Sequence, residues 1–316
     1  MGINLNPKFE TASPNEAVGI ESIIDATISK QEKTHKKGTL AKRDVHGKSH
    51  GTVRAQFRVL ADIPAALKVG LFANPASYDA DVRFSNGAPL ADIFPNVRGI
   101  AIKLYNVPGA KLLHGSEDST EHDFLLANDR TFFVDQLKYM VMMARGQMGQ
   151  IAREHPVILK YIAGAMLKFV KNPLNIDYFS QVPYLCGDNA AHYALIAQES
   201  APFFSLPNPF DADYMLHGIE KRLKQGPVKM TFCVQLQLPD ESVEDSSKLW
   251  RGKLVPVAEL TYLQTDKPLR ESDGEALSFN PWHVLKEHQP LGWPGRVRRD
   301  VYLADFNWRK KVNAEV

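Results

Sequence analysis

The sequence predicts an α+β chain: an antiparallel sheet or barrel with helical insertions and a helix near the C-terminus. Apolar and polar residues alternate with period two along several runs, most clearly in Thr52–Leu60 and Val228–Leu238. Asn-Gly and Pro-Gly pairs, at Asn86-Gly87 and Pro108-Gly109, supply turns between such runs. Helical patterns do not alternate with these strands, which argues against a doubly wound parallel sheet.

The first predicted element is a helix, which precedes the strands. Ser13-Pro14 is a helix-start signal, and Ile20, Ile23, Ile24 and Ile28 follow at helical spacing, so residues 1–38 are predicted to form an N-terminal helical arm. Residues 39–316 are predicted to form one domain. In addition to the two clearest runs, strands are expected at Asp81–Ser85, Arg98–Tyr105, His122–Leu126, Ala191–Ala197 and Val255–Leu263.

A helical insert is expected over roughly Val134–Lys171, broken at His155-Pro156. It is rich in methionine, a residue that fills irregular cores and also lines adaptable apolar binding surfaces. The core interpretation is the more common one. The methionines concerned are Met140, Met142, Met143, Met148 and Met166.

Composition excludes several classes of protein. The chain has 316 residues, 44% of them hydrophobic, and a net charge of +2, so there is no electrostatic case for a nucleic-acid partner. No apolar run approaches the roughly 20 residues of a membrane helix, and stable membrane insertion is not expected. The N-terminus lacks the pattern of a secretory signal. Two cysteines, Cys186 and Cys233, cannot build a disulfide framework, so we expect a cytoplasmic location.

The predicted helix Pro294–Arg309 groups three residues with chemical potential. At about 100° per residue, Arg298, Tyr302 and Arg309 fall on one face. A free tyrosine titrates near pH 10, so a phenolate at neutral pH needs a nearby cation or metal, and Arg298 could be that cation. One interpretation is a tyrosinate ligand to haem iron, with Arg309 at a haem propionate. The other is an amphipathic basic helix with a packed tyrosine, which this spacing alone would favour.

A second group of residues surrounds the first clear strand. His46 and His50 lie among glycines, which argues against a zinc pair on a helix. Arg83 lies between apolar residues of a predicted strand, and Arg98 begins another. An arginine that faces a core needs an anionic partner, and a haem with two propionates would be one.

These segments resemble the haem-contacting segments of the catalase superfamily, in the same order along the chain. The matching segments are Arg43–Val59, Val82–Asn86, Arg98–Tyr105, Asp123–Phe133 and Arg298–Arg309. The resemblance implies a catalase-like antiparallel β-barrel with a C-terminal haem-binding helix and haem b (iron protoporphyrin IX). It covers the barrel and this helix. Much of the wrapping and C-terminal helical sequence of large catalases is lacking, so the chain looks like the smaller catalase-related haem peroxidases.

Residue by residue, the resemblance assigns roles to eight positions. His46 matches the distal histidine and Tyr302 the proximal iron ligand, with Arg298 beside it. The propionate arginines correspond to Arg43, Arg83 and Arg309. Val45, before the histidine, resembles the peroxide-splitting catalases, whereas allene oxide synthases have threonine there. The distal asparagine departs from the pattern, because gap-free alignment places Ala127 at its position and Asn128 one residue late. Asn128 is therefore a candidate that requires a bulge or loop.

The resemblance implies a haem-dependent peroxidase that acts on hydrogen peroxide or organic hydroperoxides, with weak catalase activity. His46 would carry the proton between peroxide oxygens. A small organic or lipid donor is the expected partner, and a homo-oligomer is left open. Two alternatives remain: a non-catalytic haem- or lipid-binding barrel that serves as carrier or sensor, and a fatty-acid hydroperoxide isomerase or dehydratase.

Overall fold

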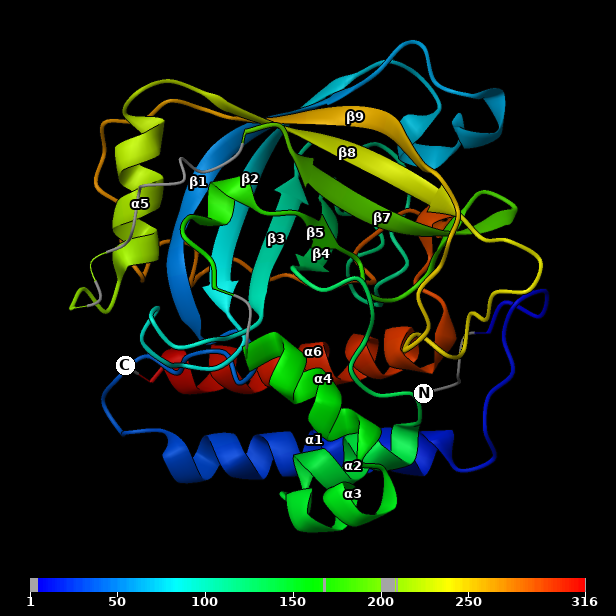
Figure 1. Ribbon diagram of the computed structural model, residues 1–316, viewed down its shortest axis with the longest axis vertical. Coiled ribbons are helices and arrows are strands. Elements are labelled where there is room, and N and C mark those ends of the chain that lie inside the picture. The colour runs from blue at the N-terminus through cyan, green and yellow to red at the C-terminus, as the bar shows by residue number, and fades with distance from the viewer. Residues whose placement is uncertain (1–4, 167–168, 200–207, 209, 316) are drawn as a thin grey trace.

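The fold is an antiparallel β-barrel with most of its helices gathered beneath it in the orientation of Figure 1. The computed structural model describes residues 5–166, 169–199, 208 and 210–315. Its strands follow the order β5-β4-β3-β2-β1-β9-β8-β7-β6, and β5 also pairs with β7. That additional pairing closes eight strands into a barrel, and β6 extends the sheet as the hairpin partner of β7. The strands are β1 (Lys48–Val59), β2 (Ser77–Asn86), β3 (Arg98–Leu104), β4 (His122–Ala127), β5 (Tyr178–Phe179), β6 (Tyr184–Cys186), β7 (Asn189–Ala197), β8 (Val228–Leu236) and β9 (Leu254–Tyr262).

Period-two patterning explains how the barrel is filled. In β1 the side chains of Val53, Ala55, Phe57 and Val59 are buried, and the residues between them are exposed or half-buried. The interior is packed with aromatic rings: Phe124 contacts Phe57, Phe232 and Tyr193 at centroid distances of 4.8–6.1 Å. Because side chains occupy the barrel interior, a large ligand must bind outside it.

The remaining residues of β2, β3 and β4 face away from this core. On β2, Val82 and Phe84 belong to the core cluster, whereas Arg83 and Ser85 line a cavity. On β4, Phe124 lies in the core, and Leu125 and Ala127 line the same cavity. Alternation along a strand therefore separates the core from a second, functional face.

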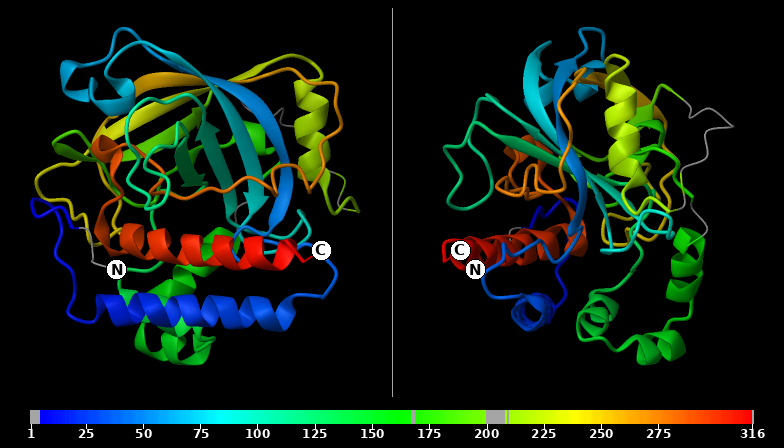
Figure 2. Two further views of the ribbon diagram at one scale, coloured as in Figure 1. Left: turned by 180° about the vertical axis from the view of Figure 1, so that it is seen from behind. Right: turned by 90° about the vertical axis from the view of Figure 1, so that its left-hand side faces the viewer.

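Two long helices form a floor below this face. Helix α6 (Gly292–Asn313) lies next to the barrel, and α1 (Glu16–Thr34) packs along its outer side, as both views of Figure 2 show. The insert forms α2 (Leu137–Ala144), α3 (Met148–Glu154) and α4 (Val157–Met166), and α2 packs against α1. Helix α5 (Tyr214–Leu223) packs beside β1. Short 3-10 helices span Ala65–Leu67, Gly70–Phe72, Pro173–Asn175 and Lys286–His288.

A buried ionic cluster ties the N-terminal segment to α6. Arg296 of α6 is 1% exposed and forms ion pairs with Glu10, Glu16 and Glu244, the last at 3.1 Å. The three carboxylates together raise the pKa of Arg296 despite its burial. Removing one partner of such a buried pair leaves an uncompensated charge, so the cluster fixes the start of α6 firmly. The division into an arm, 1–38, and a domain, 39–316, stays a prediction.

The strand pattern read from the sequence is confirmed at all seven expected positions, with ends that differ by a few residues. The insert divides into three helices and breaks at His155-Pro156 as predicted, and residues 167–168 of its expected span lie outside the described residues. The arm helix begins at Glu16 rather than at Pro14, and α5, β5 and β6 were not predicted. Among the described residues, no helix is long and apolar enough to cross a membrane.

Candidate functional site

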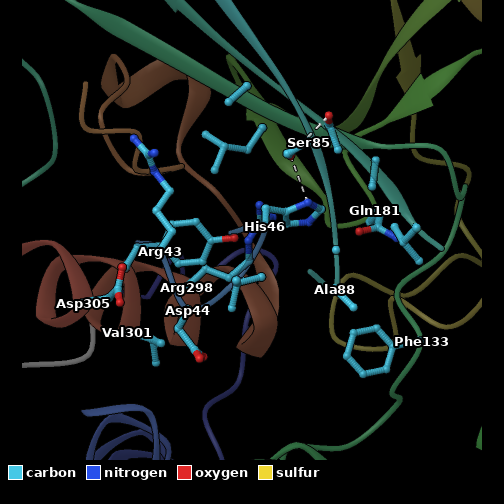
Figure 3. Close-up of a pocket in the computed structure, with 18 of the residues that line it drawn as sticks. Arg43, Asp44, His46, Ser85, Ala88, Phe133, Gln181, Arg298, Val301 and Asp305 are labelled. Atoms are coloured by element: carbon cyan, nitrogen blue, oxygen red, sulfur yellow. Dashed lines mark hydrogen bonds between the residues drawn. The ribbon is translucent and has the colours of Figure 1, made fainter. Parts of the chain in front are cut away.

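A cavity of about 630 Å³ lies between the functional face of the sheet and α6. Figure 3 shows residues from several segments converging on it: Arg43, Asp44 and His46 from the chain before β1, Ser85 from β2, and Arg298, Val301 and Asp305 from α6. Its volume falls within the range of roughly 300–1,000 Å³ that is typical of small-molecule sites. The sequence-predicted residues His46, Tyr302, Arg298, Arg43, Val45, Arg83 and Arg309 all line it.

His46 is held in place by its neighbours on β2 and β3. Its Nδ1 atom lies 3.1 Å from the Ser85 hydroxyl, and its carbonyl oxygen accepts a hydrogen bond from Arg83 Nη2 at 3.1 Å. Its backbone φ is +60°, uncommon for a residue with a side chain. A Cβ atom added to Gly99 would lie 2.5 Å from both Cε1 and Nδ1 of the ring. Glycine at 99 is therefore needed to make room for the imidazole.

The hydrogen bonds around His46 indicate which nitrogen of its imidazole ring carries the proton. Ser85 Oγ donates a hydrogen bond to the Gly99 carbonyl at 3.4 Å, so it can accept a hydrogen bond from Nδ1–H of His46. In that tautomer Nε2 is the unprotonated nitrogen. Burial, followed by the positive charges of Arg83 and Arg298, lowers the pKa of His46 to about 4. The imidazole is therefore neutral at pH 7.

Tyr302 and Arg298 form the pair predicted on the helix. They are one turn apart on α6, and Cζ of Arg298 lies 5.5 Å from the centroid of the Tyr302 ring. Burial would lower the pKa of Arg298, but the interactions with Tyr302 and Tyr184 outweigh it and raise the pKa. A permanent cation therefore lies beside a phenol that faces the cavity.

Arginines gather at one edge of the cavity. Arg43 Nη1 and Arg83 Nη2 lie 2.8 and 3.1 Å from the same oxygen of Glu275, and Arg309 pairs with Asp305 at 3.1 Å. Burial and the neighbouring charge of Arg83 lower the pKa of Arg43 to about 9, still well above neutrality. Mutual repulsion of these cations favours the binding of further negative charge.

Two of these arginines retain unused hydrogen-bond donors. Arg83 Nε is buried without a hydrogen-bond partner, and Arg43 Nη1 contacts Glu275 without hydrogen-bond geometry. Buried donors of this kind are normally satisfied. Carboxylates from a ligand would satisfy them, and the guanidinium geometry suits such groups.

The rest of the cavity wall is largely apolar. Phe132 and Phe133 lie beside the methionines of the insert, and the two rings contact each other at 4.6 Å. Met142 packs with the core of the insert, and the described methionines that line the cavity are Met140, Met143 and Met148. Met140 and Met143 also pack against that core, so the core interpretation is confirmed for three methionines, and the binding-surface interpretation stays a prediction. Val45 and Met148 are 45% and 37% exposed while they line the cavity, so its rim is apolar.

The structure does not bring Asn128 to this site. The β3–β4 register is regular, with Gly99 opposite Ala127, so there is no bulge of the kind that Asn128 would require. Ala127 lines the cavity, and Asn128 turns the other way, where its Oδ1 accepts a hydrogen bond from the Arg98 amide at 2.8 Å.

A different amide, that of Gln181, lines the cavity. It follows β5, which is two residues long and carries no sequence motif, so the sequence offered no signal for it.

Solved structures with the same fold are catalases. A bacterial catalase aligns with a TM-score of 0.66, 15% identity and coverage of 97% of this chain. A fungal catalase and catalase A from Saccharomyces cerevisiae each align with a TM-score of 0.67, 14% identity and coverage of 98%. The chain spans 62%, 65% and 67% of the length of these three proteins. This likeness establishes the catalase fold, including the closed antiparallel barrel.

A match in sequence accompanies this likeness in fold. The match is to a protein named catalase-related peroxidase, from Mycolicibacterium paratuberculosis. The two sequences are 27% identical over 252 residues, which cover 73% of this chain and 78% of the relative. No protein-family profile matches the chain.

Proposed function

We propose that this chain is a haem-dependent peroxidase that consumes hydrogen peroxide or organic hydroperoxides and has weak catalase activity. The observation that carries the proposal is one cavity that joins a neutral histidine, a tyrosine with a neighbouring arginine, and an arginine-rich edge. Haem b fits this set of residues, because the unused donors of Arg43 and Arg83 suit its propionates and the apolar walls suit its ring.

In this proposal Tyr302 would hold the haem iron through its phenolic oxygen, and Arg298 would stabilise the negative charge of that oxygen. Arg43, Arg83 and Arg309 hold the propionates. The chemistry supplied by bound haem is two-electron oxidation by peroxide. His46 Nε2 would accept a proton from one oxygen of the peroxide and return it to the other oxygen, which leaves as water or as an alcohol. The Ser85 hydroxyl keeps the imidazole in the tautomer that this transfer needs.

The exposed apolar rim of the cavity supports the proposal of weak catalase activity. Efficient disproportionation of hydrogen peroxide benefits from a narrow approach that excludes larger donors. Here Val45, Leu90 and Met148 line the cavity and remain 37–45% exposed, so the rim is open and apolar. Such a surface suits an organic hydroperoxide or a lipid donor. A reducing cytoplasm also belongs to the proposal, and the two free cysteines are buried.

The deciding experiment combines a haem titration with peroxide assays. Purified protein is titrated with haemin, and the visible spectrum is compared between the parent and Tyr302→Phe. The parent should bind one haem with the charge-transfer bands of tyrosinate ligation, and the variant should lose them. Stopped-flow mixing with hydrogen peroxide and with cumene hydroperoxide, with and without an organic donor, then measures turnover.

The outcomes separate the alternatives. Haem binding without peroxide cleavage would favour a carrier or sensor. Conversion of a fatty-acid hydroperoxide to a rearranged or dehydrated product, without donor oxidation, would favour an isomerase or dehydratase. Oxygen release from hydrogen peroxide without any donor oxidation would favour a true catalase. A parent protein that binds no haem would refute the proposal.

A further inference from the structure

Gln181 occupies a place in the cavity that the proposed mechanism has not yet used. Phe179 of β5 lies directly opposite Ala127 of β4, so Gln181 lies two residues beyond the partner of Ala127. Ala127 has a short side chain and leaves space on this wall of the cavity. In Figure 3 the Gln181 side chain extends toward His46.

The backbone at Gln181 is strained in the same way as at His46. Among the described residues other than glycine, three have positive φ: His46, Asn106 and Gln181, each at 60°. Two of these three line one cavity. Such a conformation costs of the order of 1–3 kcal/mol and tends to persist where it serves a site. The surrounding structure therefore imposes an uncommon backbone conformation on two residues that line this cavity, His46 and Gln181.

The amide group of Gln181 has a defined orientation. Its Nε2 donates a hydrogen bond to the Thr131 carbonyl at 3.0 Å, and a carbonyl oxygen can only accept. The amide nitrogen is therefore on the Thr131 side, and Oε1 is drawn on the side of His46 in Figure 3. The Tyr161 hydroxyl donates to the same carbonyl at 3.4 Å, so the segment around Thr131 anchors both side chains.

We propose that Gln181 is the peroxide-orienting amide of this site and that it favours hydrogen peroxide over alkyl hydroperoxides. The proposal rests on the peroxidase function proposed above. Hydrogen peroxide has two O–H groups: one can donate to His46 Nε2 and the other to Gln181 Oε1. An alkyl hydroperoxide has one O–H group, which His46 requires. A hydrogen-bond acceptor beside His46 therefore aids one substrate class and gives nothing to the other.

The test compares two peroxides in the haem-loaded full chain. Gln181→Leu removes the acceptor at similar size. Single-turnover cleavage of hydrogen peroxide should slow about tenfold, the effect of one hydrogen bond. Cleavage of tert-butyl hydroperoxide should stay within about twofold of the parent. If the leucine variant folds poorly, Gln181→Asn replaces it in the test, because asparagine tolerates positive φ and keeps a shorter amide. This variant should lose part of the preference for hydrogen peroxide over tert-butyl hydroperoxide. Gln198→Leu, an exposed glutamine remote from the cavity, is the matched control.

A binding measurement gives a readout that does not depend on turnover. An amide oxygen disfavours an anion beside it, so Gln181→Leu should bind fluoride as tightly as the parent or more tightly in a spectroscopic titration. Weaker fluoride binding would show that the nitrogen end faces the cavity and would overturn the proposal. An equal loss with both peroxides, accompanied by a lower Tm, would also overturn it, because Gln181 would then be structural. If the parent protein binds haem and cleaves both peroxides, the proposed peroxidase function stands, and either of these results counts against the role of Gln181 alone.

Discussion

Replacing Gly99 by alanine tests the contact that places the His46 imidazole. The new Cβ would lie 2.5 Å from Cε1 and Nδ1 of His46 and 3.0 Å from Ser85 Oγ. Ordinary contacts of carbon atoms are near 3.5–4.0 Å, so the ring must move by about 1 Å. A shift of that size in a catalytic group can cost about a hundredfold in rate. Overpacking of this kind costs about 1–3 kcal/mol of stability.

The assay measures three quantities on Gly99→Ala: haem content, Tm, and the rate of peroxide cleavage after stopped-flow mixing. Haem content should stay near that of the parent, because the axial tyrosine is on α6, and the cleavage rate should fall about a hundredfold. Gly149→Ala is the matched control, since nothing lies within 4 Å of the added Cβ there. A parental cleavage rate in Gly99→Ala, with haem content unchanged, would refute the idea that Gly99 positions His46.

Four further outcomes follow from the site. His46→Ala should retain haem and slow peroxide cleavage by about a hundredfold or more; a parental rate would make the histidine structural. Tyr302→Phe should bind haem poorly or in another spin state; an unchanged spectrum would place the ligand elsewhere. Glu275→Gln should lower the Tm of the haem-free protein and tighten haem binding, because Glu275 holds Arg43 and Arg83; unchanged affinity in a haemin titration would contradict this. Peroxide cleavage should hold its rate as pH falls to about 5 and drop below about 4, because His46 stays neutral until then; a stopped-flow profile with a midpoint near 6.5 would contradict the depressed pKa.

The same histidine makes stability dependent on pH. In the unfolded chain His46 protonates near pH 6.5, whereas in the folded chain its pKa is about 4. The unfolded state therefore binds more protons between these values, and stability falls as pH drops from about 6.5 to 4, by about 3 kcal/mol for this group. His46→Ala should lose less stability than the parent over that interval in denaturant titrations. Equal losses in the two proteins would contradict a buried, neutral His46.

The sequence predicted the long strands and the floor helix because their patterns are local. In the sequence, apolar and polar residues alternate along most of Thr52–Leu60 and along part of Val228–Leu238, and each pattern is visible without knowing its partner strand. The segments that resemble the haem-contacting segments of the catalase superfamily also occur in the same order along this sequence. Tyr302 and Arg298 share a helix, so their proximity follows from spacing alone, and the structure confirms that they are neighbours.

The parts that the sequence did not predict depend on contacts between distant segments. Strand β5 has two residues, and it exists because Phe179 pairs with both Ala127 and Ala194, far apart in the chain. No local pattern marks such a strand. The position of Gln181 in the cavity depends on that pairing, so the sequence alone could not predict it. The prediction that Asn128 lies in the cavity was wrong for a related reason. Its neighbour Ala127 lines the cavity, and successive residues of a strand point to opposite faces, so the Asn128 side chain bonds the Arg98 amide instead.

The position of α6 in the chain bears on how the protein is made. Helix α6 begins at Gly292, after β9 has ended at Tyr262, so a ribosome completes every barrel strand before it synthesises the segment with Tyr302. Helix α1, synthesised first, meanwhile has no α6 to pack against, and its apolar face stays open to solvent or to a chaperone. Before α6 is made, a nascent chain can therefore bring together Arg43, Arg83 and His46, but it offers neither Arg309 nor Tyr302. In the proposed haem protein, Tyr302 would thus become available to the cofactor only after the barrel strands have been made.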